Sequence, residues 1–218
     1  MKDDVTPRRR SRRQRTNDPD GNRRNIIEIA TQEFAENGFS GARVDEIAAR
    51  TKTSKRMIYY YFGGKEGLYI AVLEQAYRNI RSVEGTLDLA QQSPEEALRA
   101  LVGFTFDYQN AHPEFIRLVM NENILHGAYL AQSKDIQRLN LAVVSAVGDL
   151  LARGQREGVF RSDLDPIDLH MSISALCFFN VSNRATFSTI FKRDMSSRKA
   201  LAKRRAGVID LILRYVRR

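Results

Sequence analysis

The sequence of 218 residues has one cysteine, three histidines and no long hydrophobic segment. Because Cys177 has no second cysteine to pair with, an intramolecular disulfide is excluded and a reducing compartment is expected. The longest apolar run, residues 171–181, is too short to span a bilayer. The basic N-terminus also lacks the apolar core of a secretory signal. These absences predict a cytoplasmic protein with no membrane partner.

Catalytic and metal-binding motifs are absent as well. The sequence has no glycine-rich phosphate loop, no HExxH motif and no cluster of cysteine with histidine. His112, His126 and His170 are scattered singly, which disfavours a metal site or a catalytic triad. We therefore predict no enzyme activity, no cofactor and no metal, with an enzyme built on a helical pocket as an alternative.

Positive charge, in contrast, is in excess, with 35 Lys and Arg against 26 Asp and Glu and a net charge of +9. This excess favours an anionic partner, such as nucleic acid, an acidic lipid surface or an acidic protein, although it can also simply keep a surface soluble. A hydrophobic content of 43% with 28% charged residues is typical of a globular protein. The chain is long enough to bury a substantial core.

Arginine is densest in residues 1–21, which contain almost nothing that could be buried. This composition predicts a disordered arm. Such an arm can follow phosphates or enter a minor groove, or it can be a solvated tail without a fixed role. The sequence leaves both interpretations open.

Residues 44–62 predict two short helices joined by a tight turn. Val44, Ile47 and Ala48 have the spacing of one buried helical stripe. The chain breaks at residues 51–53 and restarts at Ser54, a residue type that caps helix N-termini. This order of helix, turn and helix is typical of a helix-turn-helix.

The second of these helices has an outer face of cations and hydroxyl-bearing aromatics. Lys55, Arg56, Tyr59 and Tyr60 lie on this face, between the apolar positions of the same helix. Such side chains suit contact with phosphates and with base edges in a major groove. The preceding helix, expected from about residue 22 to Gly38, is predicted to complete a small core beneath this surface.

At these residues the chain resembles a known family. Residues 54–69, SKRMIYYYFGGKEGLY, resemble the recognition helix and following turn of the TetR family of bacterial transcriptional regulators. Residues 26–48, IIEIATQEFAENGFSGARVDEIA, resemble the two helices that precede it. The match covers about residues 22–70. It implies an all-α fold, with a DNA-binding domain at 22–67 and a helical regulatory and dimerisation domain at 68–218.

Two positions depart from the family pattern. Lys52 stands where a glycine is usual, in a turn whose backbone tends to be left-handed, which costs a non-glycine residue about 1 kcal/mol. We expect the turn to form and Lys52 to project towards DNA. Ala42 and Arg43 stand where a hydroxyl residue commonly caps the second helix, so Arg43 is a candidate to replace its phosphate contact.

The resemblance implies double-stranded DNA as a partner. Lys55, Arg56 and Tyr59 are expected to read bases or nearby phosphates, and the whole candidate DNA-binding set is Arg43, Lys52, Thr53, Ser54, Lys55, Arg56, Tyr59, Tyr60, Tyr61 and Lys65. A ligand-responsive repressor that binds an inverted repeat as a dimer is the main hypothesis. The alternative is a nucleoid-like factor that is held on DNA by charge alone and has no small-molecule effector.

Further helices are expected over residues 65–81 and 133–157, and two others are expected to start at Ser93 and His112. The last two helices of the chain are expected to start at Pro166 and near Ser196. Both terminal helices are too apolar to lie in water on all sides. The resemblance implies that they form a four-helix bundle in a homodimer. A basic amphipathic membrane helix at the C-terminus is the alternative.

A ligand pocket is predicted where polar residues interrupt otherwise apolar helices. Mostly apolar walls with a few polar groups are typical of small-molecule sites, here for a small, largely apolar effector. Each residue can equally be plain core or surface. The candidate residues are Phe104, Tyr108, Phe115, Met120, Glu122, Asn123, His126, Tyr129 and Phe178.

Overall fold

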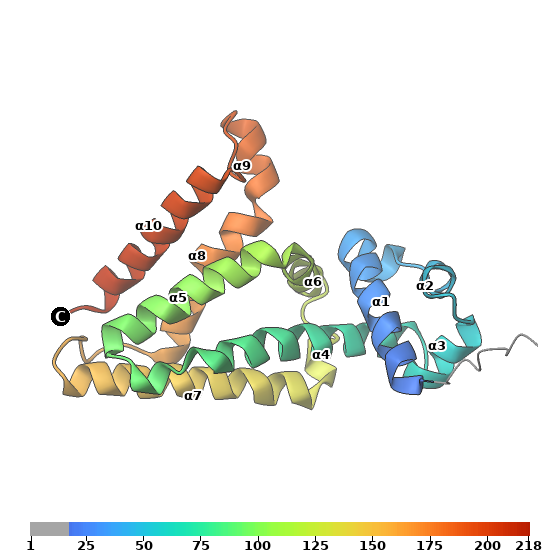
Figure 1. Cartoon of the computed structure of the whole chain (residues 1–218), viewed down its shortest axis with the longest axis horizontal. Helices are drawn as coiled ribbons and strands as arrows, with labels where there is room; N and C mark the ends of the chain where they lie inside the picture. The colour runs from blue at the N-terminus through green and yellow to red at the C-terminus, as the bar shows by residue number, and fades with distance from the viewer. Residues whose placement is uncertain (1–17) are drawn as a thin grey trace, which may run out of the picture.

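The computed structural model describes residues 18–218, which form α-helices joined by short turns (Figure 1). This part of the chain contains no β-sheet; Phe160 and Arg217 form only an isolated bridge. The predicted all-α fold is therefore confirmed.

The N-terminal head consists of α1 (Pro19–Gly41), α2 (Val44–Thr51), α3 (Lys55–Phe62) and the first half of α4 (Lys65–Glu84). Its core is built from apolar residues of all four helices. Phe34, Ile47, Ile58 and Leu68 are fully buried there, and Phe39 and Phe62 are partly buried against them. The small core predicted beneath the exposed face of α3 is thus present.

The start of α1 corrects one expectation. The arm was predicted to extend to residue 21, but α1 begins at Pro19, and the Asp18 side chain accepts a hydrogen bond from Gly21 N at 2.9 Å. Asp followed by Pro is a favourable cap and first helical residue, which explains the earlier start. The remainder of the predicted arm, residues 1–17, lies outside the described residues.

The C-terminal domain is built around α5 (Pro94–Ala111), α6 (Pro113–Ile124), α7 (Lys134–Arg156), α8 (Pro166–Ser182) and α10 (Arg198–Val216). Short 3-10 turns η1 (Gly85–Leu87) and η2 (Leu89–Gln91) lead into α5, and η3 (Leu130–Gln132) leads into α7. The predicted start of α5 is confirmed, because Ser93 Oγ accepts from Glu96 N at 3.4 Å and bonds the Glu96 carboxylate at 2.6 Å.

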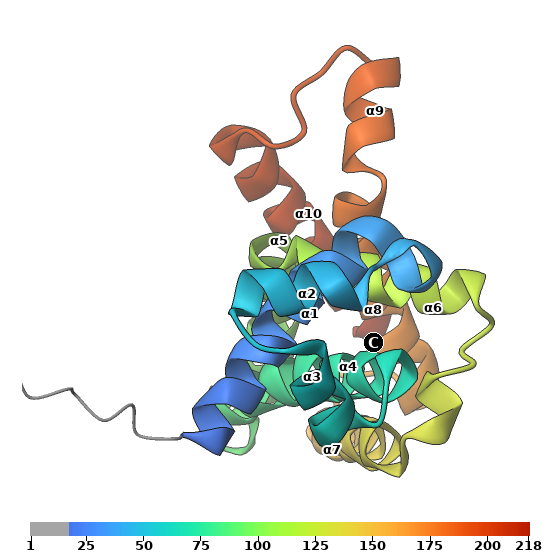
Figure 2. The ribbon, with the colours of Figure 1, turned by 90° about the vertical axis from the view of Figure 1, so that its right-hand side faces the viewer.

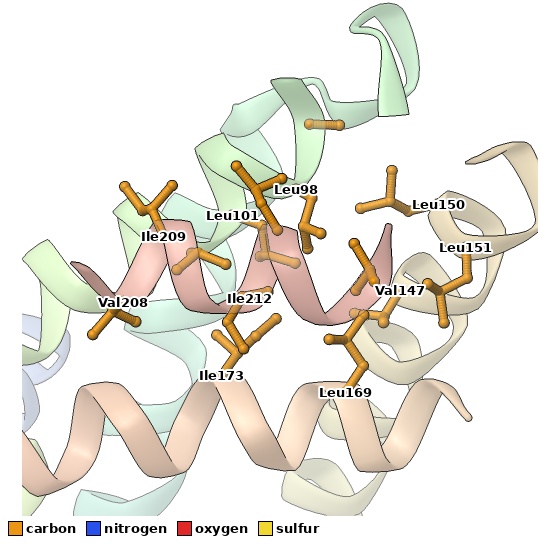
Figure 3. Packing of buried hydrophobic residues seen from close by; sticks show 14 of the residues in the cluster. Leu98, Leu101, Val147, Leu150, Leu151, Leu169, Ile173, Val208, Ile209 and Ile212 are labelled. Atoms are coloured by element: carbon orange, nitrogen blue, oxygen red, sulfur yellow. The ribbon is translucent and has the colours of Figure 1, made fainter. Parts of the chain in front are cut away.

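The core of this domain lies between α5, α7, α8 and α10 (Figure 3). Ile209 and Ile212 of α10 pack between Leu98 and Leu101 of α5 on one side and Ile173 of α8 on the other. The α7 residues Val147, Leu150 and Leu151 close the end of this cluster. At about 25 cal/mol per Å² of buried apolar surface, this cluster is a main source of the domain's stability.

One helix was not predicted. Helix α9 (Arg184–Ile190) follows α8 and, with the loop to α10, projects from the rest of the molecule (Figure 2). The predicted 65–81 helix also runs on to Glu84. The first helix breaks at Gly38, where its end was predicted and φ is +67°, but helical residues continue to Gly41. The predicted terminal helix begins at Arg198 rather than Ser196.

Head and C-terminal domain are in direct contact. Helix α1 packs on α6 as well as on α4, and Asn121 Nδ2 donates to the Phe34 carbonyl at 3.1 Å. The domain boundary expected after residue 67 falls within α4, whose Leu68, Tyr69 and Val72 belong to the core of the head. Helix α4 is therefore shared by both domains.

Among residues 18–218, no helix combines the length and the apolar character that crossing a membrane requires.

Candidate nucleic-acid interface

The turn between α2 and α3 has the predicted geometry. Lys52 is left-handed, with φ +54° and ψ +31°, and Thr53 N donates to the Ala48 carbonyl at 3.1 Å. Ser54 then caps α3, because its Oγ accepts from Met57 N at 3.3 Å. The left-handed turn and the serine cap together fix the angle at which α3 leaves α2.

Helix α3 is anchored by a single fully buried residue, Ile58. Its opposite face is open: Tyr60 is 78% exposed and Tyr59 48% exposed. Lys55 and Arg56 are exposed on the first turn of the same helix. Four large polar-tipped side chains are therefore exposed on one short helix.

The remaining candidate DNA-binding residues surround this helix. Arg43, Lys52 and Ser54 are exposed, whereas Thr53, Tyr61 and Lys65 are half-buried. Tyr61 packs partly on the core of the head and stacks edge-on against Tyr60, with the ring centroids 5.4 Å apart. The structure thus brings the predicted cations and tyrosines to one end of the head, around α3.

Two of the lysines already have partners. Lys55 Nζ lies 3.0 Å from Asp45 of α2, an exposed ion pair that contributes little stability but holds the ammonium group in place. Lys65 Nζ donates to the Ser40 carbonyl at 3.2 Å and lies 5.0 Å from the centre of the Phe39 ring. Its ammonium group is therefore held near the start of α4 rather than free to move.

Arg43 occupies the cap position of α2 but does not cap it with its side chain. Its backbone N–H instead donates to Glu33 Oε1 of α1 at 3.2 Å. The guanidinium is left exposed at the N-terminus of α2, where backbone N–H groups also attract anions. The position suits a phosphate contact.

The predicted ligand-pocket residues do not converge on one cavity. Phe104, Tyr108, Phe115 and Phe178 pack with Ile80 and Ile116 in a satellite core. Tyr129 belongs to the core of the head instead, where it contacts Phe39 and Tyr69. Met120, Asn123 and His126 are exposed, and His126 adopts a left-handed turn conformation.

Glu122 is buried, but it has a structural role. It is 1% exposed, and its Oε2 accepts from Tyr129 N at 3.2 Å and Leu130 N at 3.0 Å, which ties α6 to the chain before α7. Burial, and next the nearby Glu122 carboxylate, raise the pKa of the Tyr69 hydroxyl on α4. These residues join α6 to the head rather than line a pocket.

One cavity of the described residues was not predicted from the sequence. It has a volume of about 480 Å³ and lies between the end of α4, η2, α5 and α7. Its walls are mainly apolar, including Leu101, Val143 and Val147. No periodic signal marks such a cavity, because its apolar residues have the same helical spacing as ordinary core residues.

The polar end of this cavity is an ion pair within α4. Arg81 bonds Glu84 and also donates from Nη2 to Asn140 Oδ1 of α7 at 3.1 Å. The Arg81 Nε is buried without a hydrogen-bond partner among residues 18–218. An acceptor on a bound molecule would satisfy it, since an unpaired buried donor is costly.

Two family models match the chain. "Bacterial regulatory proteins, tetR family" covers residues 26–72, and "Tetracyclin repressor-like, C-terminal domain" covers residues 94–212. The first coincides with the head and the second with the domain that follows it.

Similar proteins agree with these models. The chain is 37% identical to the HTH-type transcriptional repressor NicS of Pseudomonas putida, over 94% of this chain and 96% of that one. It is 34% identical to the HTH-type transcriptional repressor SCO4008 of Streptomyces coelicolor, over 73% and 78% of the two chains. A crystal structure of the putative transcriptional regulator SCO4942 from S. coelicolor superposes with a TM-score of 0.68 at 25% identity, over 89% and 98%. The chain therefore belongs to the TetR family of bacterial transcriptional regulators and is itself a DNA-binding transcriptional regulator.

Proposed function

We propose that the protein is a ligand-responsive repressor that binds an inverted-repeat operator as a homodimer. The observation that carries this proposal is α3: a capped helix with one buried anchor and a face of exposed Lys55, Arg56, Tyr59 and Tyr60. Each subunit would insert this helix into a major groove, where Arg and Lys read guanine edges and the tyrosines reach phosphates. The two similar repressors support the direction of regulation. Such a protein would act in the cytoplasm, where the chromosome lies.

Preference for one DNA sequence distinguishes a repressor from a DNA-binding factor that is held by charge alone. The purified protein is incubated with genomic fragments at near-physiological salt, and the affinity for an enriched fragment is compared with that for a scrambled copy. A repressor should prefer the enriched fragment by about 10³-fold or more. Nearly equal affinities, with a steep salt dependence for both fragments, would favour the nucleoid-like alternative.

The homodimer is proposed to form through α8 and α10. Helix α8 has a stripe of exposed apolar side chains, Ile167 and Met171, one turn apart, and α10 adds Leu211 and Tyr215. Large apolar side chains repeated along one helix face favour a partner surface over water. A second copy of the chain, with the same stripe, would cover them around a two-fold axis.

The dimer proposal is tested by placing a charge in the stripe. Met171→Glu should convert the dimer to a monomer in light scattering, because two carboxylates would be buried near the axis. Ile124→Glu, at an exposed apolar residue of α6 outside the stripe, is the matched control. A dimer that persists in Met171→Glu, or dissociates equally in both variants, would contradict this interface.

The effector is proposed to bind the 480 Å³ cavity between α4, α5 and α7. A small, largely apolar molecule with one hydrogen-bond acceptor suits its walls and the buried Arg81 Nε. Helix α4 links this cavity to the head, so a ligand that favours one position of α4 would favour one spacing of the two heads. It can shift that equilibrium only by its difference in affinity between the two states.

A neutral fluorescent probe, N-phenyl-1-naphthylamine, tests the cavity before the natural effector is known. We expect saturable binding to the unmodified protein and at least about tenfold weaker binding to Ala142→Trp, which fills the cavity mouth. Ala128→Trp, at an exposed turn residue outside the cavity, should bind the probe normally. Equal binding by the two variants, or no saturable binding, would contradict the proposed location.

A further inference from the structure

A second, smaller cavity lies at the base of the α9 projection. It has a volume of about 280 Å³ and is bounded by the end of α8, by α9, by Met195 of the connecting loop and by the first turns of α10. This volume is just below the usual range for small-molecule sites, about 300–1,000 Å³, so only a small ligand would fit. It is separate from the cavity beside α4, since the two have no lining residue in common.

The lining of this cavity has positive charge and no negative charge. Arg184 of α9 and Arg204 of α10 contribute to it, together with two side-chain amides, and no Asp or Glu does. Among residues 18–218, no carboxylate forms an ion pair with either arginine. Asp107 of α5 is bound by Arg205, the residue after Arg204, at 2.9 Å.

Some arginines of the C-terminal domain have a carboxylate as counter-charge. Arg217 pairs with Glu95, Arg214 with Asp210, and the partly buried Arg81 with Glu84. Arg184 and Arg204 differ from these three because they line one cavity that no carboxylate lines. Placing cations in a recess is unfavourable unless an anion or hydrogen bonds compensate them.

The Arg184 side chain is held in place by a hydrogen bond to Asn110 of α5. Asn110 of α5 accepts, through Oδ1, from Arg184 Nη2 and from Asn180 Nδ2, the latter at 3.0 Å. Arg184 Nε is buried and has no partner among the described residues. The guanidinium is thus fixed in position while one of its donors is left without an acceptor.

The remaining walls are aromatic and apolar. Phe179 of α8 and Phe187 of α9 meet edge to face, with ring centroids 5.1 Å apart and planes at 86°. Met195 lies on the same cavity. Perpendicular rings of this kind provide one flat face and one edge against which a planar apolar group can pack.

We propose that this cavity binds a small organic anion with a flat apolar body, such as an aromatic carboxylate. Its carboxylate would accept from Arg184 and Arg204, and its ring would pack on Phe179 and Phe187. Two guanidinium groups suit a carboxylate, because each offers planar pairs of N–H donors. The site is distinct from the cavity proposed for the apolar effector, so an anionic ligand would be a second input to the same regulator.

Calorimetric titration of the full-length protein with benzoate, phenylacetate and 1-naphthoate tests the proposal. At least one of the three should bind saturably, with one site per chain. The uncharged amide of that acid, which keeps its shape, should bind at least about tenfold more weakly, a loss of about 1.4 kcal/mol. No saturable binding by any of the three at millimolar concentration, or equal binding by acid and amide, would overturn the proposal.

Variants then locate the site. Arg204→Gln and Arg184→Gln should each weaken carboxylate binding at least about tenfold, whereas Arg198→Gln, on the exposed first turn of α10, should change it less than twofold. Thermal unfolding of Arg184→Gln checks that loss of the Asn110 contact has not unfolded α9, and Arg204→Gln carries the test if it has. Unchanged binding in Arg204→Gln would overturn the assignment. DNA affinity without carboxylate is measured separately, so a negative result here does not bear on the repressor function.

Discussion

Lys52 combines a strained backbone conformation with a side chain that is a candidate for DNA binding. It takes a left-handed conformation that glycine adopts at lower cost, and its side chain stands exposed beside α3. A lysine in such a position is explained if its charge contacts a phosphate. Stability and binding should therefore respond in opposite directions when it is replaced.

Lys52→Gly should raise the free energy of unfolding by up to about 1 kcal/mol, because the left-handed penalty is relieved. The same variant should bind DNA more weakly and reduce the slope of log affinity against log salt by about 0.9, the value of one phosphate contact. Urea denaturation and DNA titrations at several salt concentrations measure the two effects. A normal salt slope would remove Lys52 from the interface.

Tyr59 and Lys65 are expected to fix the head on the DNA backbone. Tyr59→Ala and Lys65→Ala should each reduce operator affinity by about 1.5–3 kcal/mol, the value of a hydrogen bond to a charged group, without changing dimerisation. Lys134→Ala, at an exposed lysine of α7 away from α3, is the control. Fluorescence anisotropy with a bound duplex measures the losses. Unchanged operator affinity in both variants would contradict the assigned docking geometry.

At the scale of elements, Gly154 of α7 allows the chain to turn back tightly. A Cβ at this position would lie 2.0 Å from the Phe160 ring, and the Gly154 carbonyl accepts from both Val159 N and Phe160 N. Phe160 is buried in the core of the C-terminal domain. The end of α7 and the core can therefore pack this closely only because residue 154 has no side chain.

Gly154→Ala should destabilise the protein by about 1–3 kcal/mol, because Phe160 must move to accept the methyl group. Gly148→Ala, in the same helix, meets only Pro166 at an ordinary 3.5 Å and should be neutral or stabilise the helix by up to about 1 kcal/mol. Comparing the two in urea denaturation separates packing from helix propensity. Equal changes in the free energy of unfolding in both variants would show that the Phe160 contact does not contribute to stability.

The elements differ in how well their sequences predict them. Ser54 and Ser93 are side-chain caps followed by regular apolar spacing, and both helix starts were predicted because capping depends on adjacent residues. The seven-residue α9 has no buried residue, so it has no apolar stripe that would reveal it. Asp18 and Pro19 did contain a usable start signal, which the high arginine content of the preceding segment masked.

The candidate sites also differ in how well the sequence predicts them. The exposed face of α3 follows from spacing within one helix, so sequence reasoning could find it. The cavities depend on which helices meet, and single residues give no sign of that. Arg81 and Arg184 look like ordinary surface arginines in sequence, and only packing against α7 and α5 respectively places them beside cavities.

At the scale of the whole molecule, acid should destabilise the folded protein through His170 of α8. Burial and then the charge of Arg81 lower the pKa of His170 below its usual value, while Glu84 opposes the shift. His170 therefore stays neutral in the folded protein when it is already protonated in the unfolded chain. Its contribution to stability is complete above about pH 6.5 and is lost as the pH falls below that value.

Removing the imidazole should flatten this dependence. In His170→Gln the free energy of unfolding should fall less between about pH 6.5 and pH 5 than in the unmodified protein, because one proton-linked group is gone. Urea denaturation across this range measures the difference. Parallel pH profiles would show that His170 does not contribute to the acid sensitivity.

In the proposed dimer, two copies of α3 related by a two-fold axis read the operator. Selection of bound duplexes from a random pool, by the purified protein at near-physiological salt, tests it most directly. We expect enrichment of one inverted repeat whose half-sites are about one helical turn, or a multiple of it, apart. Enrichment of a single unrepeated motif would contradict the dimeric reading of the operator, and binding without any enriched motif would contradict sequence-specific regulation itself.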